Sequence, residues 1–405
     1  MKRMWAVFKK SWKFIILLFL LLLTFSYAMF QGGFVSWFLF YSFLPFAIYG
    51  LGLSFYSLGG FEVRREISKT DYFAGEPLQV KVTIKRNSAF PLFYAIIDDL
   101  FDEKLQASPQ KKKAKALLLP GFKREFSYHY VIDEMPRGEH ILQGFSIRIG
   151  DLLGLIEKEK TIPLETRLLV YPAYSELHYR PYENHFDQGM TASRERVQRD
   201  TTMATGVRDY QPGDRFSWIN WKATAKRNDI MTKEFEQRQS HDVMVVMDGA
   251  PDPRFETVVS FTASLLHAVL KKGAQAGLLT VTRERGSFPI RGGETQWQEL
   301  LYHLAKIEAT SPVSFEKVLE MEGLFVQQTV SIYLVTSQLS KPLLERAGFL
   351  GQRKGKVTIF FAKGAKEGPS PSERALITQA NARGIRVVVV NEGLFESAFS
   401  EVNYR

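Results

Sequence analysis

The chain has 405 residues, of which 45% are hydrophobic, with 53 lysines and arginines, 43 aspartates and glutamates, and no cysteine. This length allows about two or three domains, each with its own core. The lack of cysteine excludes disulfide frameworks, thiolate zinc sites and thiol nucleophiles. Residues 1–70 contain eight lysines and arginines but two acidic residues, so most of the net charge of +10 lies beside the most apolar stretch. The charge therefore indicates membrane orientation rather than a nucleic-acid partner.

Two uncharged segments, residues 14–30 and 34–55, are separated only by Gln31-Gly32-Gly33. As helices they would measure roughly 25 and 33 Å, close to the thickness of the hydrocarbon core of a membrane. The short connection predicts a tight transmembrane hairpin within residues 1–60, with both outer ends on the same side.

The charges that flank this hairpin predict its orientation. Lys9, Lys10 and Lys13 precede it, and Arg64 and Arg65 follow it. The positive-inside rule then predicts a two-pass protein of the cell membrane, with both termini and the soluble domains in the cytoplasm. A cleaved signal peptide ending at Ser26-Tyr27-Ala28 is the alternative, although the second apolar segment would still anchor the chain.

Residues 61–175 show the period of β-strands. Apolar side chains alternate with polar ones from Leu78 to Ile84 and recur at every second residue from Phe126 to Ile132. About seven such runs, separated by glycine and proline, predict a β-sandwich domain. We expect the acidic pairs Asp98-Asp99 and Asp102-Glu103 to be solvated. Lys111-Lys112-Lys113 is expected to be a solvated loop, with contact to anionic lipid or an acidic partner as the alternative.

Residues 241–405 alternate between short apolar strands and amphipathic helices. Expected strands are 243–247, 276–281, 330–335, 357–362 and 385–390, and expected helices lie near 258–269, 297–307, 341–350 and 372–383. This alternation predicts an α/β domain with a doubly wound parallel sheet.

Residues 176–240 form a separate segment with 11 basic and 10 acidic residues, a balance that does not suit a nucleic-acid groove. Pro212-Gly213-Asp214 predicts a turn, and Asp214 could cap a short helix near Phe216. Trp218 and Trp221 would share one helical face, and residues 230–236 could be a strand that feeds the parallel sheet. The charged residues of this segment could form either an internal network or a docking surface; they are Arg208, Asp209, Asp214, Arg215 and Lys226.

The same segment resembles the signature of a bacterial family, domain of unknown function fifty-eight. The matching residues are Gly206, Arg208, Tyr210, Gly213, Asp214, Arg215, Ile219, Trp221, Ala225, Lys226 and Glu234. Residues 150–155 and Val170-Tyr171-Pro172 resemble further elements of the family, although Leu152 stands where proline is usual.

The resemblance implies an immunoglobulin-like β domain and an α/β domain similar to von Willebrand factor A. It also implies association with MoxR-type AAA+ ATPases, in a non-enzymatic accessory role in the assembly or remodelling of a client. The candidate interaction motif consists of Gly206, Arg208, Tyr210, Gly213, Asp214, Arg215, Trp221 and Lys226.

Von Willebrand A domains can bind Mg²⁺ through an Asp-x-Ser-x-Ser motif, which here reads Asp248-Gly249-Ala250-Pro251-Asp252. Ala250 offers no side-chain oxygen, whereas Mg²⁺ needs oxygen ligands. We expect Asp248 to cap the turn after its strand. A degenerate, weak site at Asp248 and Asp252 is the alternative. A metal-dependent ligand binder is therefore an alternative function.

Familiar enzyme motifs are missing from the sequence. There is no Gly-x-Ser-x-Gly or His-Glu-x-x-His, and Gly351 to Lys356 is too short for a P-loop and lacks its Ser or Thr. The seven histidines are scattered. We therefore expect no catalytic residues and no cofactor, and an unrecognised hydrolase is a further alternative.

Overall fold

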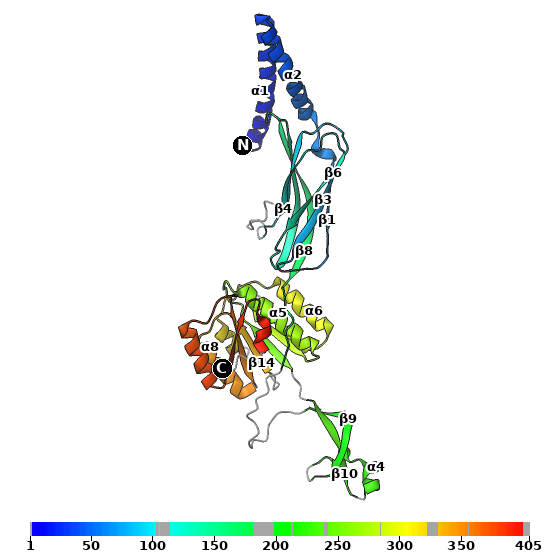
Figure 1. The fold of residues 1–405 in the computed structure, drawn as a ribbon, viewed down its shortest axis with the longest axis vertical. Coiled ribbons are helices and arrows are strands. Elements are labelled where there is room, and N and C mark those ends of the chain that lie inside the picture. The colour runs from blue at the N-terminus through cyan, green and yellow to red at the C-terminus, as the bar shows by residue number, and fades with distance from the viewer. Residues whose placement is uncertain are drawn as a thin grey trace. The chain divides into compact units, whose positions relative to one another are not determined.

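The structure is a computed structural model. It describes residues 2–102, 105, 114–180, 198–211, 214–227, 229–238, 242–283, 285–321, 331–354 and 356–399. The chain forms two compact units, Met1–Tyr171 and Pro172–Arg405 (Figure 1). Lys111-Lys112-Lys113 and Gly213 lie outside the described residues.

The first unit begins with two packed helices, α1 (Lys2–Gln31) and α2 (Phe34–Phe55). The turn between them contains Gly32 at φ 62°, a left-handed conformation that glycine adopts without steric cost. Trp12–Gln31 and Phe34–Phe55 are both long and apolar enough to cross a membrane. The prediction of two N-terminal apolar helices is confirmed.

Two β-sheets follow the helices and share one hydrophobic core. The first sheet, in the order β1-β3-β6, comprises β1 (Phe61–Ile67), β3 (Leu78–Arg86) and β6 (Glu125–Ile132). The second, in the order β2-β8-β7-β4-β5, comprises β2 (Tyr72–Phe73), β4 (Tyr94–Phe101), β5 (Lys115–Leu118), β7 (Gly138–Gly150) and β8 (Glu157–Tyr171). The buried side chains of β3 are Leu78, Val80, Val82, Ile84 and Arg86, so the period-2 pattern predicted its buried face correctly.

A buried ion pair connects the two sheets. Arg65 on β1 donates to both carboxylate oxygens of Asp99 on β4, with distances of 3.2 and 2.6 Å. The two side chains are only 1% and 0% exposed. Tyr130 on β6 also donates to Asp99, at 2.6 Å. The expectation that Asp99 is solvated was therefore wrong, because its charge is matched by Arg65, which lies 34 positions earlier in the chain.

The second unit contains a six-stranded sheet in the order β13-β12-β11-β14-β15-β16. Its strands are β11 (Val243–Met247), β12 (Ala276–Val281), β13 (Arg285–Arg291), β14 (Ser331–Thr336), β15 (Val357–Lys363) and β16 (Arg386–Asn391). The five predicted strands are present and pair in parallel. The edge strand β13, which pairs antiparallel with β12, was not predicted, so the sheet is mixed.

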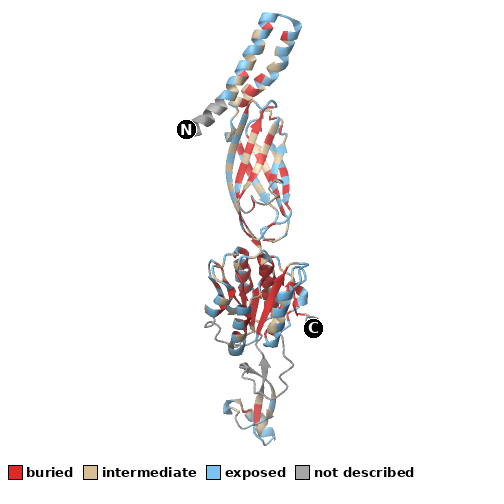
Figure 2. Ribbon diagram, turned by 90° about the vertical axis from the view of Figure 1, so that its left-hand side faces the viewer, coloured by how far each residue is buried: buried red, intermediate tan, exposed pale blue. Residues whose placement is uncertain are grey.

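Helices cover both faces of this sheet, and its central strands β12, β11, β14 and β15 are almost entirely buried (Figure 2). The helices are α5 (Phe255–Lys271), α6 (Glu294–Lys306), α7 (Phe315–Met321), α8 (Lys341–Lys354) and α9 (Pro371–Ala382). On one face, Phe261 of α5 packs against Phe360 of β15 with ring centroids 5.0 Å apart, and α6 packs against α5. Side chains of α7, α8 and α9 form a separate cluster with the strands on the other face.

A two-stranded antiparallel sheet shares no hydrogen-bonded strand with the six-stranded one. It pairs β9 (Gln198–Asp209) with β10 (Met231–Arg238). The prediction that residues 230–236 feed the parallel sheet was wrong, because β10 uses β9 as its partner. Strand β9 was not predicted from the sequence.

Candidate functional site

The connection between β9 and β10 carries most of the sequence signature. It contains the short 3-10 helix η3 (Phe216–Trp218) and the helix α4 (Trp221–Arg227). The Asn220 side chain accepts a hydrogen bond from the backbone N–H of Ala223 at 3.3 Å, at the start of α4. The Thr224 hydroxyl accepts one from the Met231 N–H at 3.0 Å. These bonds fix α4 against the beginning of β10. Residues 206–233, as far as they are described, are called the hairpin tip below.

Arg208 and Asp214 form an ion pair within the hairpin tip. The Arg208 guanidinium donates to both carboxylate oxygens of Asp214, at 2.8 and 2.7 Å. The Gln211 N–H donates to the same carboxylate at 3.0 Å. Together these hydrogen bonds, that of Arg208 first, lower the pKa of Asp214 below its usual value. This bidentate geometry makes the pair an internal brace of the turn.

Two details predicted for this segment were wrong. Asp214 does not cap the helix near Phe216, because its carboxylate is engaged by Arg208 and Gln211. Trp218 and Trp221 do not share a helical face, since η3 ends at Trp218 and extended backbone at Ile219 separates it from α4. The Arg215 guanidinium lies 5.5 Å from the centre of the Trp218 ring instead.

The hairpin tip also exposes large aromatic side chains. Phe216 is 78% exposed and Trp221 is 70% exposed. Val207 and Ile230 are exposed as well, as are the cationic residues Arg215, Lys222, Lys226 and Arg227. Trp221, Arg215 and Lys226 were in the candidate motif. Phe216 was missed, although its place two residues before Trp218 and five before Trp221 could have drawn attention to it. Gly206 lies opposite Glu234 in the strand ladder, and the Tyr210 N–H donates to the Ile230 carbonyl oxygen.

A second candidate site lies at the carboxyl edge of the six-stranded sheet. Strand β11 lies between β12, the next strand in the chain, and β14, which follows later. The order of strands therefore reverses between β11 and β14. Ligands of open α/β sheets bind at such a topological switch point. Asp248 follows β11, and Thr336 is the last residue of β14. The Thr336 hydroxyl donates to Asp248 at 2.7 Å, and the Ala250 N–H donates to the other carboxylate oxygen at 2.9 Å. Burial raises the pKa of Asp248, although these two hydrogen bonds oppose the shift.

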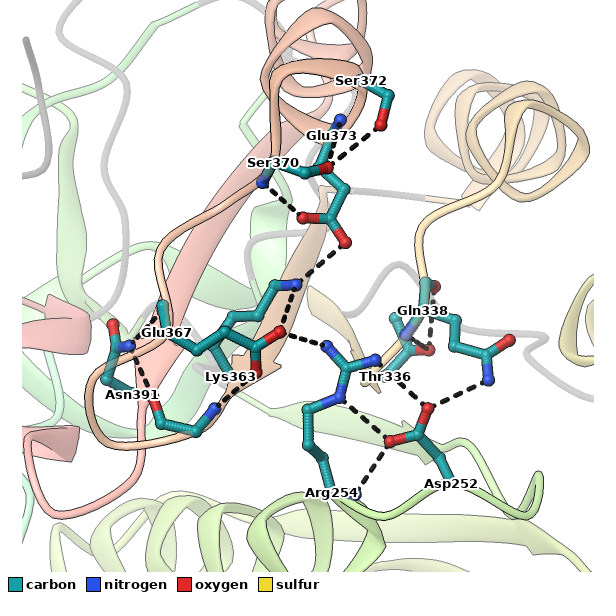
Figure 3. Close-up of polar contacts among 11 residues, drawn as sticks. Asp252, Arg254, Thr336, Gln338, Lys363, Glu367, Ser370, Ser372, Glu373 and Asn391 are labelled. Atoms are coloured by element: carbon teal, nitrogen blue, oxygen red, sulfur yellow. Dashed lines mark hydrogen bonds and ion pairs between the residues drawn. The ribbon is translucent and has the colours of Figure 1, made fainter.

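Asp252 is held by a cation from its own loop (Figure 3). Arg254 donates to it through its backbone N–H at 2.8 Å, Nε at 3.0 Å and Nη2 at 3.2 Å. The Gln338 amide donates at 3.0 Å. Burial alone would raise the pKa of Asp252, but the hydrogen bonds from Arg254 and Gln338 outweigh it and lower the pKa to about 2.

The network continues along the sheet edge from Arg254. Its Nη1 lies 3.5 Å from Glu367, which also pairs with the buried Lys363 at 3.2 Å. Lys363 in turn pairs with Glu373 at 2.9 Å, in the first turn of α9. Positive and negative side chains therefore alternate along the edge (Figure 3).

These residues do not fit a Mg²⁺ site. A metal would need carboxylate oxygens that are open to it, in near-octahedral geometry. Asp252 instead receives four hydrogen bonds, three of them from the cationic residue Arg254. Asp248 is engaged by Thr336 and Ala250. Among the residues that the structure describes, no group of three or more histidine, aspartate or glutamate side chains could hold a metal ion.

The low pKa of Asp252 predicts a pH dependence of stability. Because its pKa falls from 3.8 to about 2 on folding, ionised Asp252 stabilises the fold above about pH 4, and this stabilisation is lost as the pH falls toward 2. The shift corresponds to about 2 kcal/mol. The Asp252→Asn variant should therefore be less stable than the native chain by about that amount at neutral pH. The difference, measured by hydrogen exchange of the β11–α5 loop, should shrink below about pH 4. A constant difference would contradict this assignment.

Comparisons with known proteins agree with the family resemblance of the sequence signature. A sequence profile of the family described as "Protein of unknown function DUF58" matches residues 206–367. The chain is 41% identical to "Uncharacterized protein YeaD" of Bacillus subtilis (strain 168) over 396 residues, which covers 97% of this chain and 98% of that protein.

Solved structures show only remote similarity. BatB from Bacteroides thetaiotaomicron is 12% identical with a TM-score of 0.28, covering 37% of this chain and 90% of that chain. The ArnB paralog VWA2 from Sulfolobus acidocaldarius is 8% identical with a TM-score of 0.21, covering 84% of this chain and 53% of that one. No functional conclusion follows from such scores. The relative that matches nearly the whole chain, together with the profile over the signature, shows that the chain belongs to the DUF58 family.

Proposed function

We propose that this protein is a non-enzymatic docking module, anchored in the cell membrane by α1 and α2, whose hairpin tip binds a protein partner in the cytoplasm. The partner class we propose is a MoxR-type AAA+ ATPase, which would act with this chain on the assembly or remodelling of a client. The observation that carries the proposal is the exposure of Phe216 and Trp221 on an internally braced element.

The bracing matters because a rigid aromatic surface loses little conformational entropy when it binds. Aromatic and arginine side chains are also the residue types that contribute most to protein interfaces. The Arg208–Asp214 pair and the Thr224 bond to β10 hold the tip in place without any partner. The exposed cations around Trp221 would favour an acidic surface on the partner.

Besides the helical hairpin, the proposed architecture has two parts. The two sheets of the first unit would form an immunoglobulin-like sandwich, and the second unit would be a von Willebrand factor A-like domain. The cytoplasmic orientation rests on the basic residues that flank the hairpin, Lys9, Lys10 and Lys13 before it and Arg64 and Arg65 after it.

The two alternative functions, metal-dependent ligand binding and hydrolysis, find less support in the geometry. Metal-dependent binding would require Asp252, which Arg254 and Gln338 already engage. A hydrolase would need a nucleophile next to a base, whereas the polar groups at the switch point bind one another.

Co-purification from detergent-solubilised membranes tests the proposal. We expect the native chain to enrich the MoxR-type ATPase of the same cell, and the Phe216→Ser, Trp221→Ser double variant to lose it. Leu394→Ser is the matched control, because Leu394 is an exposed apolar residue outside the hairpin tip. Equal recovery of the ATPase with all three chains, or none with any, would refute docking through this surface.

A further inference from the structure

The β domain exposes large apolar side chains almost entirely at one end. Those exposed among the described residues of 56–171 are Phe93, Leu117, Leu119, Phe122, Val131, Leu152 and Leu153. All of them except Val131 lie in or next to three loops, between β3 and β4, β5 and β6, and β7 and β8. The strand register brings these loops together, because Tyr94 pairs with Gly150, Ala95 with Leu118, and Lys85 with Glu125. Phe93, Leu117, Leu119, Phe122, Leu152 and Leu153 are called the apolar rim below.

The loops that carry the apolar rim are built as fixed structures. Arg86 is buried, and its guanidinium donates to the carbonyl oxygens of Lys123 and Gly121, each at 2.7 Å. Leu92 and Gly121 exchange backbone hydrogen bonds at 3.0 Å. In the third loop, the Asp151 carboxylate accepts from the Ile156 N–H at 2.7 Å. Leu119 and Phe122, which are 77% and 72% exposed, are therefore held outward by ordered backbone.

The same end of the domain is attached to the helical hairpin. Lys158 on β8 donates to the carbonyl oxygens of Ser54 at 2.6 Å and Tyr56 at 2.7 Å, at the end of α2. Lys13 of α1 donates to the Gly154 carbonyl oxygen at 3.3 Å, between Leu153 and Leu155.

Aromatic contacts reinforce this attachment. The Tyr49 ring of α2 lies 4.4 Å from that of Phe93 and 5.6 Å from that of Phe90, measured between ring centroids. Hairpin and apolar rim are thus joined by direct contacts within one compact unit.

These contacts fix the depth of the apolar rim if the hairpin spans the membrane, as the proposed function requires. Helix α2 has 22 residues and is about 33 Å long, whereas the hydrocarbon core is about 30 Å thick. Tyr49 precedes the last residue of α2 by six positions, which is about 9 Å along the axis. A loop that packs on Tyr49 therefore lies within about 9 Å of the end of the spanning helix, near the boundary between the hydrocarbon core and the lipid headgroups.

We propose that the apolar rim inserts into the bilayer interface beside the hairpin, so that the β domain is seated directly on the membrane. The partner is the lipid bilayer itself. Burying leucine and phenylalanine side chains there is favourable because it removes apolar surface from water. The exposed Lys123 and Arg124, which follow Phe122, would meet anionic headgroups. Seating would hold the β domain in one orientation on the membrane surface.

The absence of cysteine from the chain allows a direct test by depth-dependent fluorescence quenching. Single-cysteine variants of the full chain, Leu119→Cys, Phe122→Cys and Leu152→Cys, would be labelled with an environment-sensitive nitrobenzoxadiazole probe. They would be reconstituted in vesicles of phosphatidylcholine and phosphatidylglycerol. Val131→Cys is the control on the same domain, and Leu22→Cys reports on the hairpin itself. Spin-labelled lipids and aqueous iodide serve as the two quenchers.

The proposal predicts that shallow spin-labelled lipids quench the three rim probes, and that iodide quenches the Val131→Cys probe more strongly than them. If the rim probes respond like the Val131→Cys probe while the Leu22→Cys probe is quenched by lipid, the rim does not insert, although the hairpin does. If the Leu22→Cys probe is not quenched by lipid either, membrane anchoring fails, and the proposal fails with it. Circular dichroism of each labelled variant confirms that it is folded.

Discussion

Replacing Asp99 with alanine is expected to destabilise the β domain by about 3–5 kcal/mol, because the change leaves the buried Arg65 guanidinium without its counter-charge. Arg65 would keep its hydrogen bonds to the carbonyl oxygens of Leu142 and Leu164 and to the Thr166 hydroxyl, but these groups carry no negative charge. Hydrogen exchange of the full chain in detergent micelles would measure the loss in the amides of β1, β4 and β6. The amides of β11 to β16 serve as an internal reference.

A second variant separates loss of charge pairing from loss of packing. In the Arg65→Met, Asp99→Leu double variant both charges are gone, and such replacements of buried pairs are often neutral or stabilising. We therefore expect it to be more stable than Asp99→Ala. A change below about 0.5 kcal/mol for Asp99→Ala, the size typical of surface substitutions, would contradict the role of the pair.

Replacing Arg254 with alanine is expected to have the next largest effect. Asp252 would lose its bonds to Nε and Nη2 but keep those from the backbone N–H and from Gln338. An incompletely satisfied carboxylate of this kind costs about 1–3 kcal/mol. The melting temperature of the native chain should not respond to Mg²⁺, because the guanidinium occupies the carboxylate. In Arg254→Ala, Mg²⁺ should recover part of the lost stability, since binding to the folded state raises it.

Arg254→Lys provides the control for this prediction. Lysine keeps the charge but not the planar fork that binds both oxygens of Asp252, so this variant should be intermediate in stability and unresponsive to Mg²⁺. Stabilisation of the native chain by Mg²⁺ would show that a metal binds despite Arg254. It would revive the metal-dependent alternative.

Local periodicity predicted the regular elements well. Strands such as β3 and β11 carry their own signal, either alternation or a continuous apolar run. The helix expected near 372–383 is α9, which runs from Pro371 to Ala382. Strand β9 was missed because its sequence, from Gln198 to Asp209, contains few apolar residues. The edge strand β13 was missed for a related reason, since an edge strand buries little of its surface.

The charged sites could not be predicted in the same way. Arg65 and Asp99 lie on different sheets, so no local pattern connects them. Asp252 and Arg254 are two positions apart, yet the sequence does not say whether such neighbours face each other. At the hairpin tip, the sequence marked Arg208 and Asp214 as important. Only the fold distinguishes these bracing residues from the exposed Phe216 and Trp221.

The most direct test of the docking role is a binding titration between the purified full chain in detergent and the purified MoxR-type ATPase of the same organism. The account predicts a saturable complex, and a Kd raised by about 30-fold or more for Phe216→Ser or Trp221→Ser, the loss expected for central aromatic residues of an interface. Leu394→Ser should bind as the native chain does. Equal affinity of the native chain and both hairpin-tip variants, or no complex with any of them, would contradict it.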